Sequence, residues 1–255
     1  MVLDFSRLPD LSAEQPELDP DELLLAGHTK ARRDALWMVF GDTAPTDHVI
    51  RPMERELLAA WPHGGILRHP PSEDRTDWTY VTHGLAHPRH PDAAARFARD
   101  DERPSGRGIE LAVSTEVDVT WAPKMLMSLA RHLVLRPEAP NILPLDRMPL
   151  HRSVDGRART ELRYLLARNA RGYEHELILP GGLCDLVHLV GITLAEFERT
   201  RTLPAGAGSA ALVLVLDVAG VGSLTDPRRQ CVTTRPDFEE LWAAARDEVE
   251  AGIGN

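Results

Sequence analysis

The chain of 255 residues contains only two cysteines, Cys184 and Cys231, too few for a disulfide framework. Its start, M-V-L-D-F-S-R-L-P-D, lacks the positive charge followed by an apolar run that marks a secretory signal. No apolar segment approaches the ~20 residues that cross a bilayer. We therefore expect reduced thiols, a cytoplasmic location and no membrane insertion.

Lysine is nearly missing as well: Lys30 and Lys124 are the only two, and the formal net charge is −10. An acidic surface repels phosphate backbones, which argues against nucleic-acid binding. The same field would attract a basic protein partner and speed its association. Net charge also serves simply to keep a protein soluble, and this is the more ordinary interpretation.

Signatures of common catalytic sites are not found. The sequence contains no G-x-S-x-G, no P-loop and no G-x-G-x-x-G before a helix. Gly106-x-Gly108 leads into a strand, which is the wrong context for phosphate binding. Cys184 has no neighbouring Lys or His to activate its thiol. We expect no cofactor and no enzymatic activity.

What the sequence does contain is an ordinary globular composition, with 43% hydrophobic and 27% charged residues. Residues 1–20 are acidic and rich in proline, which predicts an arm, and residues 21–255 are expected to form a single domain. Asp19-Pro20-Asp21-Glu22 is a good helix start. Apolar spacing then continues to Val39, and Gly27 leaves open whether this is one helix or two.

Alternating and helical patterns predict the remaining elements. Strands are expected at Trp78–Leu85, Ile109–Val119, Glu174–Leu179, Asp185–Ile192 and Leu224–Val232. Helices are expected at Met53–Trp61, Ala122–Leu135, from a Thr193 cap with Glu196 to about Arg201, and at Asp237–Ala251. The sequence therefore predicts an α+β fold with a mixed, mainly antiparallel sheet flanked by helices.

Residues 209–218, S-A-A-L-V-L-V-L-D-V, fit either class. Their alternation and β-branched content favour a strand. A helix is the other possibility, and the resemblance described next favours it.

Five blocks occur in one order: Trp78–Leu85, Ser105-Gly106-x-Gly108-x-Glu110-Leu111, Trp121 with Leu126 and Leu129-Ala130-Arg131, Leu189–Thr193 with Glu196, and Thr225-Asp226-x-Arg228-Arg229. This order resembles the Suppressor of fused (Sufu) domain family. His132 departs from it, since the position after Arg131 is often aromatic in relatives.

The resemblance implies a protein-binding domain, with a helix at residues 209–218. Eukaryotic members carry a second, C-terminal domain for which this chain is too short, so a stand-alone, bacterial-type member is expected. Such relatives are associated with immunity to polymorphic toxins. We therefore expect a protein partner, with a basic toxin domain as the candidate, while a general peptide-binding adaptor is an alternative.

His83-x3-His87-x2-His90 is the strongest candidate for metal chemistry, because three imidazoles can hold zinc. The pattern is not HExxH, and Pro88 and Pro91 forbid a regular helix. Packing at a strand end is the favoured role of His83. A metal-dependent enzyme built on these histidines is thus kept only as the alternative, and no metal site is predicted.

Glu110 lies between apolar neighbours, on the strand face opposite Ile109 and Leu111. A half-buried carboxylate there could act as an acid or base. Pairing with an arginine such as Arg131 or Arg228 is favoured, because buried charges persist mainly when paired.

The remaining candidates for partner binding are Asp226, Arg228 and Arg229 at the end of the last predicted strand. Pro227 would make this an edge, where a partner peptide can add, although Asp226 could equally cap a turn. Trp78, Tyr80 and Trp121 are the aromatic candidates, for which a core role is favoured over an interface role; Trp78 and Tyr80 are retained with Glu110 as candidate contacts.

Overall fold

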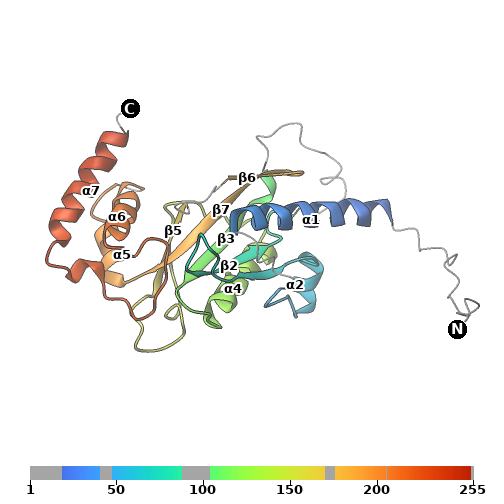
Figure 1. The fold of residues 1–255 in the computed structure, drawn as a ribbon, viewed down its shortest axis with the longest axis horizontal. Helices are drawn as coiled ribbons and strands as arrows, with labels where there is room; N and C mark the ends of the chain where they lie inside the picture. Colours follow the sequence, from blue (N-terminus) through green and yellow to red (C-terminus); the bar gives the residue numbers. More distant parts are fainter. Residues whose placement is uncertain (1–18, 41–47, 88–103, 170–175, 205, 254–255) are drawn as a thin grey trace, which may run out of the picture.

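The computed structural model describes residues 19–40, 48–87, 104–169, 176–204 and 206–253. Their centre is a seven-stranded sheet in the order β1-β2-β3-β7-β5-β4, with β6 pairing against β7 (Figure 1). The strands are β1 (Gly65–His69), β2 (Trp78–His83), β3 (Pro104–Thr115), β4 (Arg147–Pro149), β5 (Tyr164–Asn169), β6 (Glu176–Leu179) and β7 (Gly182–Ile192). β3 and β7 are parallel, and the other pairings between these strands are antiparallel. The predicted α+β class is confirmed.

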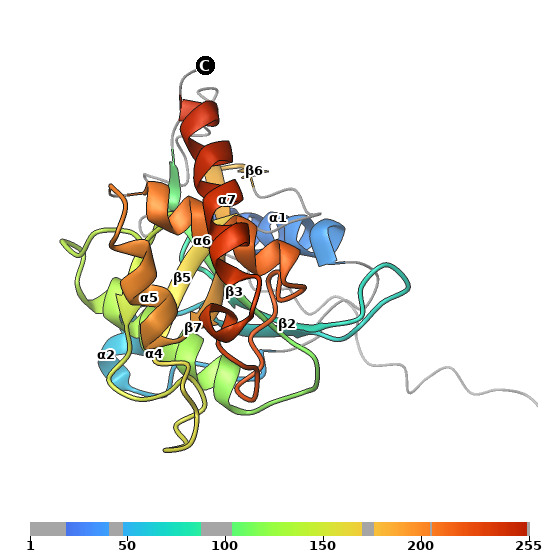
Figure 2. The same cartoon turned by 90° about the vertical axis from the view of Figure 1, so that its left-hand side faces the viewer.

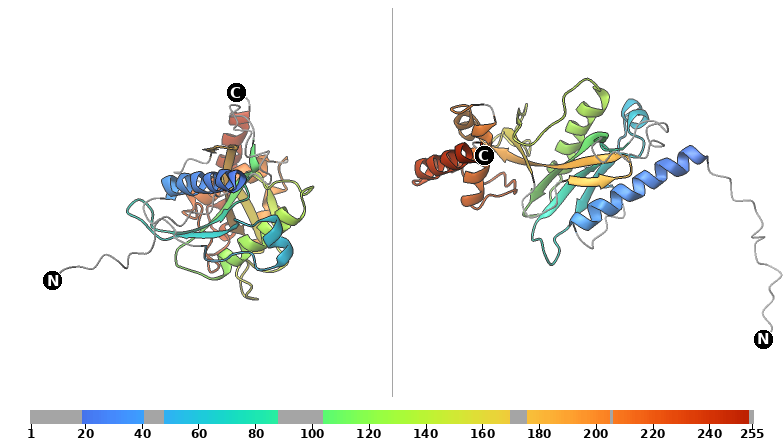
Figure 3. Two further views of the ribbon diagram at one scale, coloured as in Figure 1. Left: turned by 90° about the vertical axis from the view of Figure 1, so that its right-hand side faces the viewer. Right: turned by 90° about the horizontal axis from the view of Figure 1, so that it is seen from above.

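Helices cover both faces of this sheet. They are α1 (Pro20–Phe40), α2 (Arg55–Ala60), α4 (Trp121–Leu135), α5 (Leu194–Thr200), α6 (Ala207–Val218) and α7 (Phe238–Ile253), with a 3₁₀ turn, η1, at Val232–Thr234. α1 crosses one face, and α4 with α2 lies on the other, as the view from above shows (Figure 3). α5, α6 and α7 gather at one end of the sheet (Figure 2). Within the described ranges, no helix has both the length and the apolar character to span a membrane.

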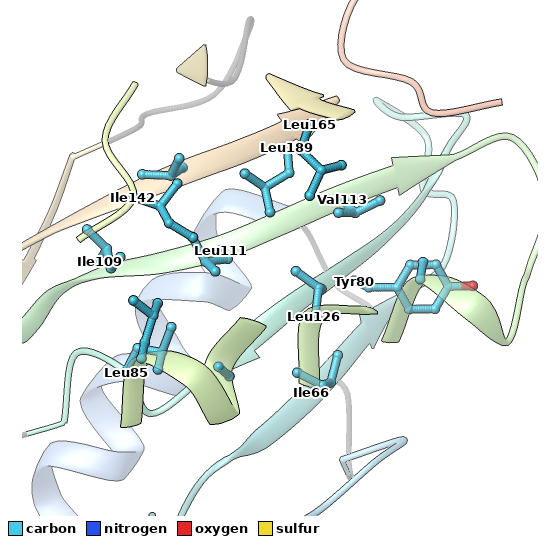
Figure 4. Packing of buried hydrophobic residues seen from close by; sticks show 14 of the residues in the cluster. Ile66, Tyr80, Leu85, Ile109, Leu111, Val113, Leu126, Ile142, Leu165 and Leu189 are labelled. Carbon is cyan, nitrogen blue, oxygen red and sulfur yellow. The ribbon is translucent and has the colours of Figure 1, made fainter. Parts of the chain in front are cut away.

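The α4 face carries the largest apolar cluster. Alternate residues of the strands point to this face, as the period of two requires. The sheet residues of the cluster include Ile66, Tyr80, Ile109, Leu111, Val113, Leu165 and Leu189, which surround Leu126 of α4 (Figure 4). Burying each large side chain stabilises the fold by about 1.5–3 kcal/mol, so this layer fixes α4 on the sheet.

The opposite face is divided between two helical groups. α1 contributes Ala35, Leu36 and Phe40, which pack with Val81 and Ala112. Farther along the sheet, α6 and α7 cover the end of β7 and its neighbour β5. That cluster includes Leu166, Val190, Ile192, Ala211, Leu212, Val215, Phe238 and Trp242. A sheet covered on both faces explains why its central strands are almost wholly apolar.

Several local predictions are confirmed. α1 begins at Pro20 after Asp19, whose Oδ1 accepts a hydrogen bond from the Asp21 N–H at 3.0 Å, and it runs through Gly27 as one helix. Thr193 and Glu196 form the expected capping box. Residues 209–218 are helical, as the family resemblance favoured.

One local prediction is wrong. Leu224–Val232 is not a strand: Leu224 makes only an isolated bridge to Ser114, and turns follow it. Pro227 has no N–H for a ladder, and the Asp226 carboxylate accepts from the Arg228 N–H at 2.9 Å, which closes a turn instead. Strand β1 (Gly65–His69) has no counterpart among the strands expected from the sequence.

The register of the β3–β7 pairing shifts between Pro104 and Ile109, where Gly106 and Gly108 lie. Both glycines have positive φ, 56° and 70°. A Cβ at Gly106 would lie 2.5 Å from the His87 carbonyl oxygen, so no larger residue fits. Residues 1–18 of the expected arm fall outside the described residues, Pro20 is the first residue of α1, and the division into arm and single domain stays a prediction.

Candidate functional site

A groove of about 940 Å³ runs between α4 and β4. Leu126, Ala130 and Leu133 of α4 are buried against the sheet. The neighbouring stripe of the same helix lines the groove; it consists of Trp121, Met125, Leu129 and His132, at spacings of four, four and three. Trp121, Met125 and Leu129 are apolar and only partly buried against the core, so the side of α4 that faces the groove is largely apolar.

β4 forms the opposite wall of the groove. Among the described strands, it is the last of the sheet path and pairs with β5 alone. Met148 and the following Leu150 are partly buried against the α4-face cluster, so the groove floor is apolar. An open strand edge is where an extended segment can add. Pro149 offers no N–H donor, so an added strand would depend on the rest of β4.

The backbone that enters β4 is strained. Leu145 has φ = 75°, the one positive value at a non-glycine position in the described ranges. A leucine rarely adopts this conformation, which costs about 1–3 kcal/mol and persists only where surrounding contacts enforce it. The N–H of Leu145 donates to the Ala167 carbonyl at 2.7 Å, and the Ala167 N–H donates to the Asp146 carbonyl at 2.8 Å. These bonds hold the turn in place beside the groove.

The groove rim is positively charged although the whole chain is acidic. Lys124 and Arg152 line it, are exposed, and have no ion-pair partner among the described residues. The acidic residues of the rim are already engaged: Asp146 accepts from the Leu143 N–H at 2.8 Å, and Asp155 accepts from the Arg157 N–H at 3.0 Å. These bonds do not remove the two negative charges, but with Arg147 the groove lining holds three cations against two carboxylates, a net charge of +1.

A second hollow of about 700 Å³ adjoins the first and shares Trp121 and Asp155 with it. Three of the sequence-predicted residues, Asp226, Arg228 and Arg229, lie here. Arg228 is exposed and pairs loosely with Asp226 at 3.3 Å. The predicted edge strand is not formed, so these residues border the hollow from a turn rather than from a sheet edge.

Arg229 serves the fold. Its guanidinium lies 2.5 Å from the Glu196 carboxylate, which also accepts from the N–H groups of Thr193 and Val232, each at 2.8 Å. Burial alone would raise the pKa of Glu196, but the hydrogen bonds and charge of Arg229 outweigh it and place this pKa below its ordinary value. The pair ties the turn to the start of α5, and little of Arg229 is exposed to a partner.

Tyr80 is completely buried, and its hydroxyl donates to Asp118 at 2.6 Å and accepts from the Val119 N–H at 2.7 Å. Burial raises its pKa to about 12. Trp78 is half-buried against the same cluster, with the Arg68 guanidinium 5.6 Å from its ring centroid. Tyr80 therefore cannot contact a partner directly, and Trp78 presents only part of its ring.

Glu110 is fully buried on the α1 face, opposite Ile109 and Leu111 as expected. Its charge partner is Arg32 of α1, 3.8 Å away, rather than Arg131 or Arg228. Arg131 pairs with Glu54, and Arg228 lies beside Asp226. The expectation of an arginine partner was right, and both suggested partners were wrong. The actual partner precedes Glu110 by 78 residues in the sequence, and only tertiary packing brings the two together.

The Glu110 carboxylate also accepts from Thr82 Oγ1 at 2.6 Å and from the N–H groups of Gly84 and Ala86 at 2.7 and 3.1 Å. Burial raises its pKa, and the Arg32 charge and these donors act against the rise. With its acceptor sites used inside the core, Glu110 holds α1 to the sheet and is not placed to act on a substrate.

The histidine candidates for metal binding are not brought to an open site. His83 is fully buried, and its Nδ1 lies 2.9 Å from His48 Nε2. His87 Nδ1 lies 2.9 Å from the Arg32 guanidinium, whose charge repels a cation. His90 is outside the described residues. Within the described ranges, no three His, Cys, Asp or Glu side chains are grouped to hold a metal.

The comparison with protein families decides the assignment. The model of the family described as Suppressor of fused protein (SUFU) matches residues 60–230. The chain belongs to the Sufu family. The match covers β1 to β7, α4 and both hollows, so the groove is part of the Sufu domain itself. No curated protein matches the sequence significantly.

Solved structures share this fold at low sequence identity. A chain of the Sufu-Fu complex crystal structure has a TM-score of 0.65 and 20% identity, with 85% of this chain and 97% of that chain covered. Drosophila Suppressor of Fused has a TM-score of 0.55 and 20% identity over 74% of this chain, but only 46% of its own. A putative SUFU homolog from Neisseria gonorrhoeae FA 1090 has a TM-score of 0.50 and 15% identity, with 73% of this chain and 87% of that chain covered.

Sequence reasoning missed the groove residues Met125, Leu129 and Met148. The signal was present: the apolar residues of α4 occupy more of the helix circumference than one buried stripe requires. The β4 wall of the groove could not be predicted from the sequence, because only the β5–β7 and β4–β5 registers bring Met148 to the same side of the sheet as α4.

Proposed function

We propose that this Sufu domain is a non-enzymatic protein-binding module whose groove between α4 and β4 receives a segment of a partner protein. The observation that carries this proposal is the pairing of an apolar helix stripe with an open sheet edge in one groove. One structure with this fold is that of a complex, Sufu-Fu, which supports protein binding as the role of the fold here as well.

The groove chemistry describes the segment it would take. Half-buried Trp121, Met125 and Met148 favour apolar side chains. Exposed Lys124 and Arg152 favour a carboxylate on the same segment, because no described acidic residue neutralises either of them. We therefore propose a short extended segment with apolar residues and at least one Asp or Glu.

The partner we propose is a toxin domain that this protein neutralises as an immunity protein. The net charge of −10 supports long-range attraction of a basic domain, while the cationic rim would act only after contact. The fold is also found in a bacterial homolog, that of Neisseria gonorrhoeae. Trp78 and Arg228 remain candidate peripheral contacts of such a partner, because each is at least partly exposed.

A binding screen against toxin domains encoded beside this gene tests the proposal. In the groove, Arg152→Glu reverses a free rim charge and should weaken binding at least tenfold, about 1.4 kcal/mol. Arg163→Glu is the matched control, since Arg163 is exposed but lines neither hollow, and it should leave affinity unchanged. Equal affinity of both variants would refute the groove as the site.

Rescue of toxin-expressing cells separates immunity from the adaptor alternative. An immunity protein should restore growth, and Arg152→Glu should reduce the rescue. Groove-dependent binding of the toxin domain without any rescue would contradict the immunity role and favour a general adaptor.

A further inference from the structure

The N-terminal sequence has the composition that the lining of the groove between α4 and β4 favours. Residues 4–11 read D-F-S-R-L-P-D-L and combine two carboxylates with three large apolar side chains: Asp4, Asp10, Phe5, Leu8 and Leu11. The inference that follows rests on the proposed function, because it assigns a second occupant to the same groove and thereby a regulation of partner binding.

The spacing of the three apolar residues suits one backbone form. Phe5, Leu8 and Leu11 recur every third residue, and a polyproline II helix has three residues per turn, so they share one face of such a helix. Pro9 favours this form and disfavours an α-helix through the residues before it. Polyproline II segments bind grooves lined by aromatic side chains, and Trp121 lines this groove.

Charge is complementary between the two parts. Residues 1–18 hold four acidic side chains and one arginine, a net side-chain charge of −3. The groove lining holds three cations against two carboxylates, a net charge of +1. Two of these cations, Lys124 and Arg152, are exposed and can receive a carboxylate.

The chain enters the domain beside one end of the groove. α1 begins at Pro20, and its Leu25 lines a small cavity together with Val134, near the C-terminal end of α4. The preceding residue of α4, Leu133, lines the groove. The helix from Pro20 to Leu25 is about 7.5 Å long at ~1.5 Å per residue. The N-terminal residues are therefore attached close to the Leu133 end of the groove.

The length of the chain fits this attachment. The groove-lining part of α4 runs from Trp121 to Leu133, about 18 Å along the helix. Residues 4–11 in polyproline II form span about 22 Å. Residues 12–19 can then bridge up to about 26 Å, which is enough chain to turn back from the start of α1 to the end of the groove.

We propose that residues 4–11 occupy the groove of their own molecule and compete with the partner segment. The attachment sets the direction, because residue 11 is nearest to the start of α1. Leu11 therefore lies at the Leu133 end of the groove, and Asp4 lies at the Trp121 end.

This direction assigns contacts to both kinds of side chain. Phe5 packs on Trp121 and Met125, which are only partly buried by the core. Asp4 meets the ammonium group of Lys124, which lies one turn along α4 from Trp121.

The attachment also sets the strength of the competition. A segment tethered by a short linker has an effective concentration on the order of 1 mM. With an intrinsic Kd on the order of 100 µM, a partner that must displace it binds about tenfold more weakly than it would to an empty groove.

Methyl spectra of the full chain, labelled at its six methionines, test the occupancy directly. Met125 and Met148 line the groove, whereas the exposed Met38 and Met53 line neither hollow. Each signal is assigned by its loss when that methionine is replaced by leucine. A variant with two serines in the N-terminal segment, Phe5→Ser with Leu8→Ser, should move the two groove signals and leave the two exposed ones in place.

Two controls accompany this comparison. Val2→Ser changes an apolar residue outside residues 4–11 and should move none of these signals. The positions of the groove signals in the wild-type protein should also be unchanged over roughly a hundredfold dilution. A dilution-dependent position would mean that a second copy supplies the segment, and would overturn occupancy within one molecule.

A synthetic peptide of residues 1–18 provides the second measurement. It should bind the double-serine variant with a Kd on the order of 100 µM and the wild-type protein about tenfold more weakly, because the attached residues compete. Asp4→Lys in the peptide should weaken binding about tenfold. Glu14→Lys makes the same change of charge outside the bound residues and should keep the affinity within about twofold.

Three results would overturn the proposal: unmoved groove signals in the double-serine variant, equal peptide affinity of this variant and the wild-type protein, or equal weakening by the two peptide substitutions. None of these measurements uses a toxin domain, so their failure is separate from that of the proposed function. If the spectra and the peptide behave as expected but no toxin domain binds, only the proposed function fails. A toxin domain that binds in the groove with equal affinity for the wild-type protein and the double-serine variant would overturn the competition alone.

Discussion

Acidification from pH 7.5 to 5.0 should destabilise this domain strongly, because several histidines are buried in the neutral form. His69, His83 and His188 are fully buried and His87 nearly so. Burial is the main cause of lowered pKa values at all four: to about 3 for His69 and His87, to about 4 for His188, and well below the ordinary value for His83.

The direction of the effect follows from these shifts. The unfolded chain takes up protons on these histidines as the pH falls through about 6.5, whereas the native state stays unprotonated until about pH 3–4. Above pH 6.5 the histidines are neutral in both states and do not oppose folding. As the pH falls below 6.5, protonation favours the unfolded state, so the free energy of unfolding decreases. At pH 5.0 the loss is about 2 kcal/mol for each of His69, His87 and His188 and about 6 kcal/mol for these three together, and His83 adds to it in the same direction.

Glu110 acts in the opposite direction. Its raised pKa lets the native state take up a proton more readily than the unfolded state, which offsets part of the loss at low pH. The net effect is still large against the 5–15 kcal/mol that typically stabilises a domain.

Urea unfolding followed by circular dichroism at the two pH values measures this loss. We expect the free energy of unfolding to fall by several kcal/mol at pH 5.0 with an unchanged m-value. His188→Leu should reduce the difference between the two pH values by about 2 kcal/mol, whereas His151→Gln, at an exposed position, should leave it intact. A difference below about 1 kcal/mol for the wild-type protein would refute the reasoning.

Two further predictions concern the buried ion pairs, and urea unfolding at pH 7.5 checks both. Arg32→Met should destabilise the domain by about 3–5 kcal/mol, because it leaves the Glu110 carboxylate buried without a counter-charge. Adding Glu110→Gln should restore a substantial part of the lost free energy of unfolding. If the double variant is no more stable than Arg32→Met alone, the unpaired charge is not the cause. Arg229→Met should cost about 3 kcal/mol through Glu196, whereas Arg228→Met at the exposed neighbouring position should cost less than about 0.5 kcal/mol, so equal effects would contradict the assigned roles.

Local signals in the sequence were sufficient for much of the fold. The alternation in Trp78–His83 and the apolar run ending at Ile192 indicated strands, and the Thr193–Glu196 capping box marked a helix start. Residues 209–218 show where local signals fail. Their alternating valines and leucines fit a strand, yet α6 is buried along enough of its circumference that period and composition no longer distinguish the two classes.

Long-range contacts account for most of what the sequence could not reveal. Strand alternation placed Glu110 on the correct face, but its partner Arg32 comes from a helix that tertiary packing alone brings near. The Leu224–Val232 segment was misassigned because Asp226 and Pro227 favour a turn over a ladder. The groove was missed for the same reason as the ion pair, since its two walls meet only through the sheet registers.

Steric blockage of the groove tests the central claim most directly. Ser128 is exposed on α4 and lines the groove, and Ala244 is exposed on α7, far from it in sequence and outside both hollows. With a toxin partner found in the screen, isothermal titration calorimetry should show that Ser128→Trp weakens binding at least tenfold, about 1.4 kcal/mol, while Ala244→Trp leaves it within twofold. Wild-type affinity of a folded Ser128→Trp protein would contradict binding in the groove between α4 and β4.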